Sequence, residues 1–107
     1  IENYLDKVLE DKIIKQKLPS NIEIATGQPL NLQAKLEGHP LPEVQWLKDG
    51  IKIESSEDVK IIKKPDGTVA LNIEQARPED SGKYELKAIG PKGESTSYSD
   101  VVVGGIL

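Results

Sequence analysis

The side chains that could do chemistry in this chain are few, and their types exclude the common enzyme mechanisms. His39 is the single histidine, and cysteine is absent. Nucleophilic catalysis of the hydrolase type needs a hydroxyl or thiol beside a positioned base. His39 stands in the segment GHPLPE, where we interpret it as a solvated loop residue, with a pH-sensitive contact as the alternative. The sequence therefore predicts no enzyme and no catalytic residue.

Metal and cofactor sites are equally unsupported by the residue types. One histidine without any thiol cannot complete the four ligands of a zinc site. The acidic segment ESSEDVK carries Glu54, Glu57 and Asp58, but it lacks the spacing and the glycine of a calcium-binding loop. We interpret this segment as a solvated loop. No metal and no cofactor are predicted.

Charge and composition limit the partners and the compartment. The 107 residues include 14 lysines and arginines against 18 acids, a net charge of −4 that disfavours a nucleic-acid partner. No apolar run approaches the roughly 18 residues that span a bilayer, so no membrane association is expected. Small β-rich domains in oxidising compartments commonly carry disulfides, whereas this chain has no cysteine. We therefore expect a cytoplasmic location.

Two groups of lysines invite an interpretation as a binding surface. Charged residues on an edge strand commonly prevent unwanted strand pairing, and we favour that role over a docking patch. The lysines are Lys12, Lys15 and Lys17 near the start of the chain and Lys60, Lys63 and Lys64 near Pro65.

Short runs of alternating apolar and polar residues predict the elements that hold these side chains. This period of two is typical of β-strands, and turn-forming residues separate the runs every 8–12 residues or so. Asp66-Gly67 between two runs indicates a tight hairpin. Six or seven strands are expected, and the fold class is all-β. The runs begin near Leu30, Val44, Val69, Tyr84 and Val101.

The first residues follow a different pattern. Ile1, Tyr4, Leu5, Val8 and Leu9 recur at helical spacing, with charged residues between them. A frayed linker or a helix that docks on a neighbouring domain would both fit this pattern. We expect a linker over residues 1–13, one domain over 14–104 and a tail over 105–107.

Three features together resemble a known family. Trp46 stands alone beyond the run that contains Leu32 and Ala34, and the corner motif Asp80-x-Gly82-x-Tyr84 precedes an inward position at residue 86. The chain resembles the immunoglobulin fold of the I-set type, found in tandem along giant muscle proteins such as titin, twitchin and obscurin. The resemblance covers residues 15–103 and implies an immunoglobulin-like antiparallel β-sandwich.

The resemblance also implies roles for particular residues. Trp46 and Leu71 would lie in the core, and the ring of Tyr84 would be buried while its hydroxyl binds backbone upstream. Asp80 would accept backbone N–H bonds in the corner, and Gly82 would suit a crowded position. The family's inter-sheet cysteines map onto Ala34 and Leu86, so the sandwich would form without a disulfide. Exposed Tyr98 and His39 are candidate contacts.

The function implied by the resemblance is structural. The chain would be one bead of a modular intracellular protein of the sarcomere, acting as a mechanical spacer and docking surface. Its partners would be neighbouring immunoglobulin or fibronectin-type domains and sarcomeric proteins. Two alternatives stay open: an extracellular recognition domain of an adhesion molecule or receptor, and an accessory domain beside a muscle kinase.

Overall fold

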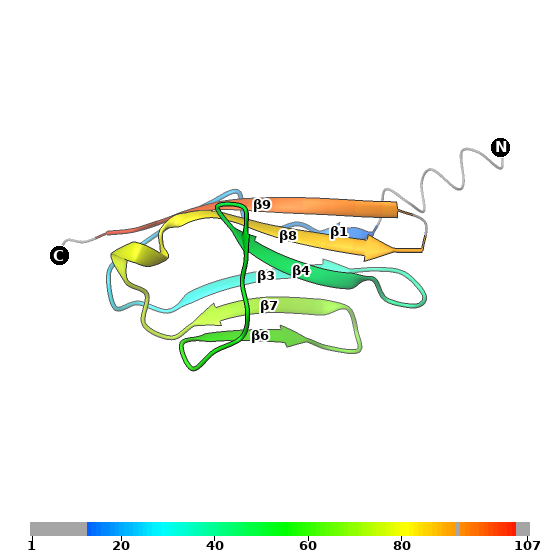
Figure 1. Ribbon diagram of the computed structural model, residues 1–107, viewed down its shortest axis with the longest axis horizontal. Coiled ribbons are helices and arrows are strands. Elements are labelled where there is room, and N and C mark those ends of the chain that lie inside the picture. Colours follow the sequence, from blue (N-terminus) through cyan, green and yellow to red (C-terminus); the bar gives the residue numbers. More distant parts are fainter. Residues whose placement is uncertain (1–12, 92, 105–107) are drawn as a thin grey trace.

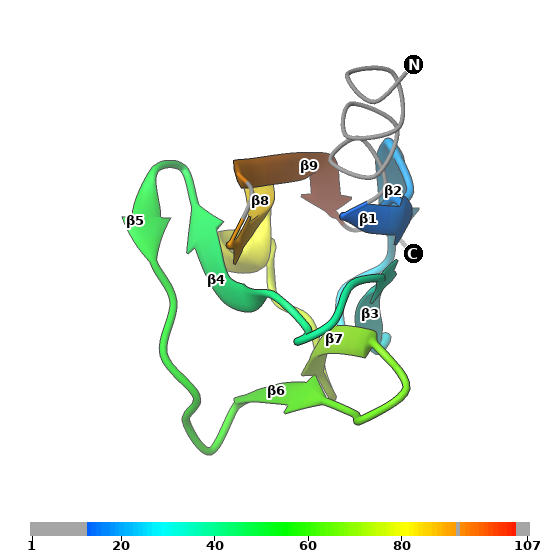
Figure 2. The same cartoon turned by 90° about the vertical axis from the view of Figure 1, so that its right-hand side faces the viewer.

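The computed structural model describes residues 13–91 and 93–104, which form two facing β-sheets (Figures 1 and 2). The all-β sandwich expected from the sequence is confirmed. The first sheet contains, in spatial order, β1 (Ile14–Gln16), β3 (Leu30–Leu36), β7 (Thr68–Ile73) and β6 (Val59–Lys63). The second contains β2 (Asn21–Ile24), β9 (Gly93–Val103), β8 (Gly82–Gly90), β4 (Glu43–Lys48) and β5 (Ile51–Lys52). One 3₁₀ turn, η1 (Pro78–Asp80), precedes β8.

Alternating sequence produces this architecture because successive side chains of a strand point to opposite faces. Along β3 the apolar residues are buried and the polar ones between them are exposed or half-buried. β8 and the second half of β9 show the same alternation. The inward-facing side chains of both sheets form a single apolar core, which includes Leu30, Leu32, Leu36, Val69, Ile73, Ala88, Val101 and Val103.

Strand pairing differs from the expected antiparallel pattern in one place. β2 pairs with β9 in parallel, with Asn21 opposite Asp100 and Ile24 opposite Val103. The other pairs are antiparallel among the described residues. The reason is that the chain crosses from the first sheet to the second between β1 and β2. This crossing separates β1 from β2, and with the short β5 the residues 13–91 and 93–104 form nine strands where six or seven were expected.

The crossing depends on a side chain from the far end of the sequence. Pro19 follows Leu18 at this point and has no N–H to donate to either sheet. The Leu18 N–H instead donates to the Ser97 hydroxyl at 2.9 Å. Ser97 and Ser99 both face the interior, as the alternation of the last strand predicts. Ser97 therefore satisfies a buried backbone donor that would otherwise have no partner.

The hairpin expected at Asp66-Gly67 connects β6 and β7. Asp66 accepts a hydrogen bond from the Thr68 N–H at 2.9 Å, and Gly67 has φ +98°. The Gly67 carbonyl accepts the Leu36 N–H at 2.7 Å, so the turn lies directly against β3. A Cβ on Gly67 would overlap the Leu36 carbonyl oxygen. Glycine is required here by conformation and by space.

The segment expected to be a linker lies almost wholly outside the described residues, as does the expected tail. Ile13, the last residue of that linker, is buried in the core, and its carbonyl accepts the Glu37 N–H at 2.9 Å. The sandwich therefore includes Ile13. At the other end, the Gly104 N–H donates to the Ile24 carbonyl at 3.1 Å.

Candidate functional site

The residues expected at the centre of the sandwich all lie in its core. Trp46 is 2% exposed, and Leu71 and Leu86 are fully buried. Leu86 pairs with Trp46 between β8 and β4, while Ala34 pairs with Val69 in the opposite sheet. Because the chain has no cysteine, apolar contact alone joins the sheets at this level. The indole N–H has no acceptor among the described residues, so Trp46 contributes through its area rather than a hydrogen bond.

The corner before β8 contains the three residues of the motif Asp80-x-Gly82-x-Tyr84. The Tyr84 hydroxyl donates to the Asp80 carbonyl at 2.6 Å. The Asp80 carboxylate accepts the Arg77 N–H at 2.8 Å, which closes the turn η1. Gly82 has φ +155°, and a Cβ there would lie 2.8 Å from an Asp49 oxygen. The corner is thus a rigid structural unit that positions β8.

Burial changes the acidity of the corner tyrosine. Desolvation raises the pKa of Tyr84 to about 12, and the nearby charges of Asp80 and Asp49 add to the effect. Each of these causes disfavours the phenolate. Tyr84 is therefore a neutral hydrogen-bond donor throughout the physiological pH range and is unsuited to act as a base.

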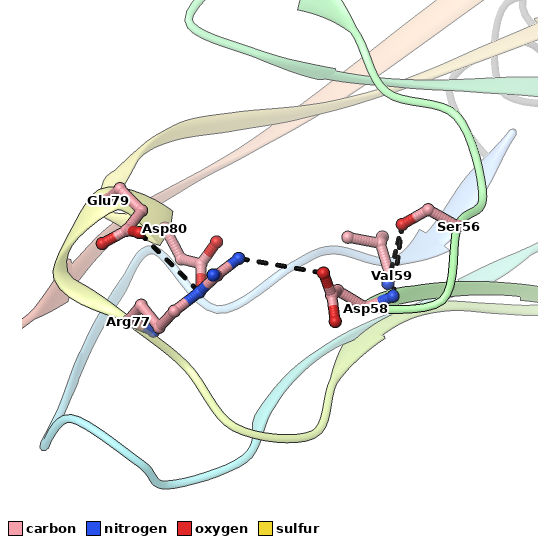
Figure 3. A network of polar contacts seen from close by, with 6 residues as sticks. All are labelled: Ser56, Asp58, Val59, Arg77, Glu79 and Asp80. Carbon is pink, nitrogen blue, oxygen red and sulfur yellow. Dashed lines mark hydrogen bonds and ion pairs between the residues drawn. The ribbon is translucent and has the colours of Figure 1, made fainter.

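A polar network lies beside this corner (Figure 3). The Arg77 guanidinium reaches the carboxylates of Asp58 and Glu79 at 3.9 and 3.8 Å. The Ser56 hydroxyl accepts the Val59 N–H at 3.2 Å and so fixes the loop that carries Asp58. All three ionised side chains are mostly exposed, so each pair contributes at most about 1 kcal/mol. The network tethers two loops and offers no nucleophile beside a base.

The described chain enters and leaves the sandwich at opposite ends. Ile13 bonds to the start of the loop between β3 and β4, whereas Val103 bonds to Ser81 beside η1. Figure 1 shows β9 ending at the same end of the sandwich as η1, with the loop between β3 and β4 at the other. A domain with this arrangement can be joined head to tail with others.

The two candidate contacts are both exposed but lie in different places. Tyr98 is 47% exposed on β9, and the Lys83 ammonium lies 4.5 Å from its ring centre. His39 lies in the loop between β3 and β4 and lines a shallow hollow with Lys15 and Lys35. The structure does not bring Tyr98 and His39 to one surface, since Tyr98 faces outward from the second sheet and the hollow beside His39 is lined by residues of β1 and β3 in the first sheet.

Three exposed apolar residues were missed by the sequence analysis. Ile51, Val102 and Ile62 are large side chains that face solvent. Val102 could have been identified, because it alternates out of phase with buried Val101 and Val103. Ile51 gave no such signal, since β5 has only two residues.

The described residues contain neither a candidate metal cluster nor a candidate membrane-spanning helix. Within residues 13–91 and 93–104, no three histidine or acidic side chains gather in a way that could hold a metal ion. The same residues include no helix with the length and apolarity needed to cross a bilayer.

Comparison with known proteins gives a consistent result. Residues 13–103 match the family profile described as the immunoglobulin I-set domain. The chain is 37% identical to titin of Drosophila melanogaster over 111 residues, covering 99% of this chain and 1% of that protein. It is 37% identical to the smooth-muscle myosin light chain kinase of Gallus gallus over 81 residues, covering 75% of this chain and 4% of the kinase.

A solved structure supports the same assignment. The titin domains Z1Z2 in complex with telethonin superpose with a TM-score of 0.81 at 34% identity, over 88% of this chain and 47% of that one. The chain thus spans only 1% and 4% of the lengths of these two curated relatives. The sandwich, the corner and these similarities lead to one conclusion: this chain belongs to the immunoglobulin I-set family of domains.

Proposed function

We propose that this domain is one bead of a tandem array in a sarcomeric protein of the cytoplasm, where it serves as a mechanical spacer and docking module. Its relatives include titin, myopalladin and the muscle M-line assembly protein unc-89. The neighbouring partners would be immunoglobulin or fibronectin-type domains of the same chain. The domain itself would have no catalytic role, because its polar residues serve the corner and the turns.

The observation that carries this proposal is the parallel pairing of β2 with β9. β2 follows the chain's entry and β9 leads to its exit, so a pull on the two ends loads their hydrogen bonds in shear. The Asp100 N–H donates to the Ser20 carbonyl at 2.9 Å, and the Gly104 N–H donates to Ile24. By strand alternation the Val102 N–H points to β2 as well. These bonds must break together before the sandwich opens.

A single substitution tests the mechanical role. Val102→Pro removes one donor of this pairing, and Val102→Ala is the matched control because the side chain is exposed. In single-molecule pulling of a tandem repeat, we expect the proline variant to unfold at a clearly lower force and the alanine variant to behave like the wild type. Equal unfolding forces for all three proteins would contradict the mechanical proposal.

The similarity to a myosin light chain kinase favours a second candidate, an accessory domain beside a kinase. The domain would then position the kinase in the filament without taking part in phosphate transfer. The sequence of the parent protein on either side tests this candidate, since a kinase would show its glycine-rich loop and catalytic-loop motif. A parent with a signal peptide and a membrane span would instead favour the extracellular alternative.

A further inference from the structure

The two sheets differ sharply in where they carry acidic residues. The strands of the second sheet contain five carboxylates, Glu23, Glu43, Glu85, Glu94 and Asp100. The four strands of the first sheet contain none, although they carry Lys15, Lys35, Lys60 and Lys63. A chain of net charge −4 therefore presents one face that is locally basic.

The strand register shows what this outer face consists of. Asn31, Asn72 and Lys60 form one row across β3, β7 and β6, and Gln33, Ala70 and Ile62 form the next. A third row contains Gln16, Lys35 and Thr68. The face thus combines lysines with amide and hydroxyl groups around one exposed apolar residue, Ile62.

The lysines of this face are available for a partner. The ion pairs among the described residues involve Lys52 and Arg77, which lie elsewhere. Asp66 lies at the rim, where the hydrogen bonds from Thr68 are the main cause that lowers the pKa of its carboxyl, and the charges of Lys35 and Lys64 add to the effect. Lys63 instead bonds to the Pro42 carbonyl at 2.7 Å and is not part of the face.

The same face contains a depression that is lined by lysines and polar side chains. Where β1 ends after Gln16, an open depression of about 610 Å³ lies beside β3. Lys17 and Lys35 line it together with Gln33 and Thr68. Two ammonium groups, an amide and a hydroxyl around one depression can pair with carboxylates and with the peptide groups between them.

We propose that the outer face of the first sheet, centred on this hollow, docks an acidic polypeptide segment of a partner protein. This inference rests on the proposed function as a docking module and adds the chemistry of the partner. A nucleic acid is less suited to the face, because the four strands carry no aromatic side chain on which bases could stack and no arginine. An anionic membrane would favour a larger cluster of cations than these few lysines provide.

Binding of a labelled oligoglutamate peptide tests the proposal directly. We expect the wild-type chain to bind the peptide at low ionic strength and to lose affinity as salt is added. The variant K17Q/K35Q should bind about fivefold more weakly, since two exposed ion pairs are removed. The control variant K52Q/K87Q removes the same charge from the second sheet, and its affinity should stay within about twofold of the wild type.

Mapping of the bound peptide provides a measurement that needs no variant. Backbone amide NMR signals of Gln33, Lys35 and Thr68 should shift on addition of oligoglutamate, and those of β8 and β9 should not. Absence of binding, equal weakening by both double variants, or shifts confined to the second sheet would overturn the proposal. Tighter binding of single-stranded RNA or phosphatidylserine vesicles would overturn it too. None of these results would alter the unfolding force, so the mechanical proposal is tested separately.

Discussion

Leu86 lies at the position where apolar packing must substitute for a covalent link between the sheets. It is fully buried and pairs with Trp46, and the resemblance to the family aligns it with a cysteine. A leucine facing a small residue such as Ala34 can fill a volume similar to that of a disulfide. In a reducing compartment the bridge would not form, so this exchange removes reactive thiols without a loss of stability there.

Truncation of Leu86 measures how much this packing contributes. Leu86→Ala should lower the free energy of unfolding by about 2–5 kcal/mol, because it leaves a cavity beside Trp46. Chemical denaturation followed by tryptophan fluorescence checks the value. Ile51→Ala is the control, since Ile51 is 73% exposed and its loss should change stability by less than about 0.5 kcal/mol. A change that small for Leu86→Ala would show that the side chain is not in the core.

Tyr84 offers a second prediction, from its hydroxyl. Tyr84→Phe should cost about 1 kcal/mol, because the Asp80 carbonyl loses its donor. The folded state raises the pKa of Tyr84 to about 12, above its value in the unfolded chain. This group's contribution is therefore complete below about pH 10 and is lost as pH rises toward 12. Denaturation midpoints from pH 8 to 12 should fall more for the wild type than for Tyr84→Phe, and parallel curves would contradict the assignment.

Single-residue roles could be predicted from the sequence where the interacting residues are close together in the chain. Asp80 and Tyr84 are four residues apart, so one short motif was enough for the resemblance to the family to imply a corner here. The bond from Leu18 to Ser97 joins positions 79 residues apart and had no sequence signal. Alternation with Val101 and Val103 predicts that Ser97 faces inward, but it does not identify the donor that its hydroxyl binds.

Among the elements, the hairpin between β6 and β7 shows how a turn is fixed by a neighbouring strand. Asp66-Gly67 was predicted as a turn from residue type alone. The structure adds that Gly67 lies against β3, with its carbonyl bonded to Leu36. The turn therefore locks three strands of the first sheet rather than two.

Alanine substitution tests this contact. Gly67→Ala should destabilise the domain by about 2–5 kcal/mol, since it adds steric overlap with Leu36 to the strain of positive φ. Gly50→Ala is a matched control with φ +85° and no atom within 4 Å of the added Cβ, so it should cost about 1–2 kcal/mol. Equal losses in urea denaturation would show that the contact with β3 is unimportant.

The parallel pairing of β2 with β9 could not be predicted from alternation. Periodicity tells which residues of a strand face inward, but it does not tell which strand lies beside it. A proline at position 19 is compatible with a break in a strand, whereas the transfer of the chain to the other sheet depends on packing between segments far apart in sequence. The predicted sandwich is confirmed, and this one parallel pair is a detail that the general description as antiparallel did not include.

For the whole molecule, the assignment of strands to sheets shows that acidic residues are unevenly distributed, which the overall composition does not show. Net charge indicated a mildly acidic protein and made the lysines look like edge protection. Once each strand is assigned to a sheet, all strand carboxylates fall on the second one. Protection of a sheet edge and docking of a partner are compatible functions for these lysines. Lys15 lies on the edge strand β1, where it can prevent strand pairing, and Lys35 lies on the inner strand β3, where it has no edge to protect.

We expect residues 34 and 86 to meet across the sandwich, where apolar contact joins the sheets. The most direct test is the double variant Ala34→Cys with Leu86→Cys, because a disulfide forms only if the two Cα atoms lie within about 7 Å. We predict that mild oxidation yields one intramolecular disulfide and raises stability over the reduced form by about 2–4 kcal/mol. Thiols that stay free, or that pair only between molecules, would contradict the account.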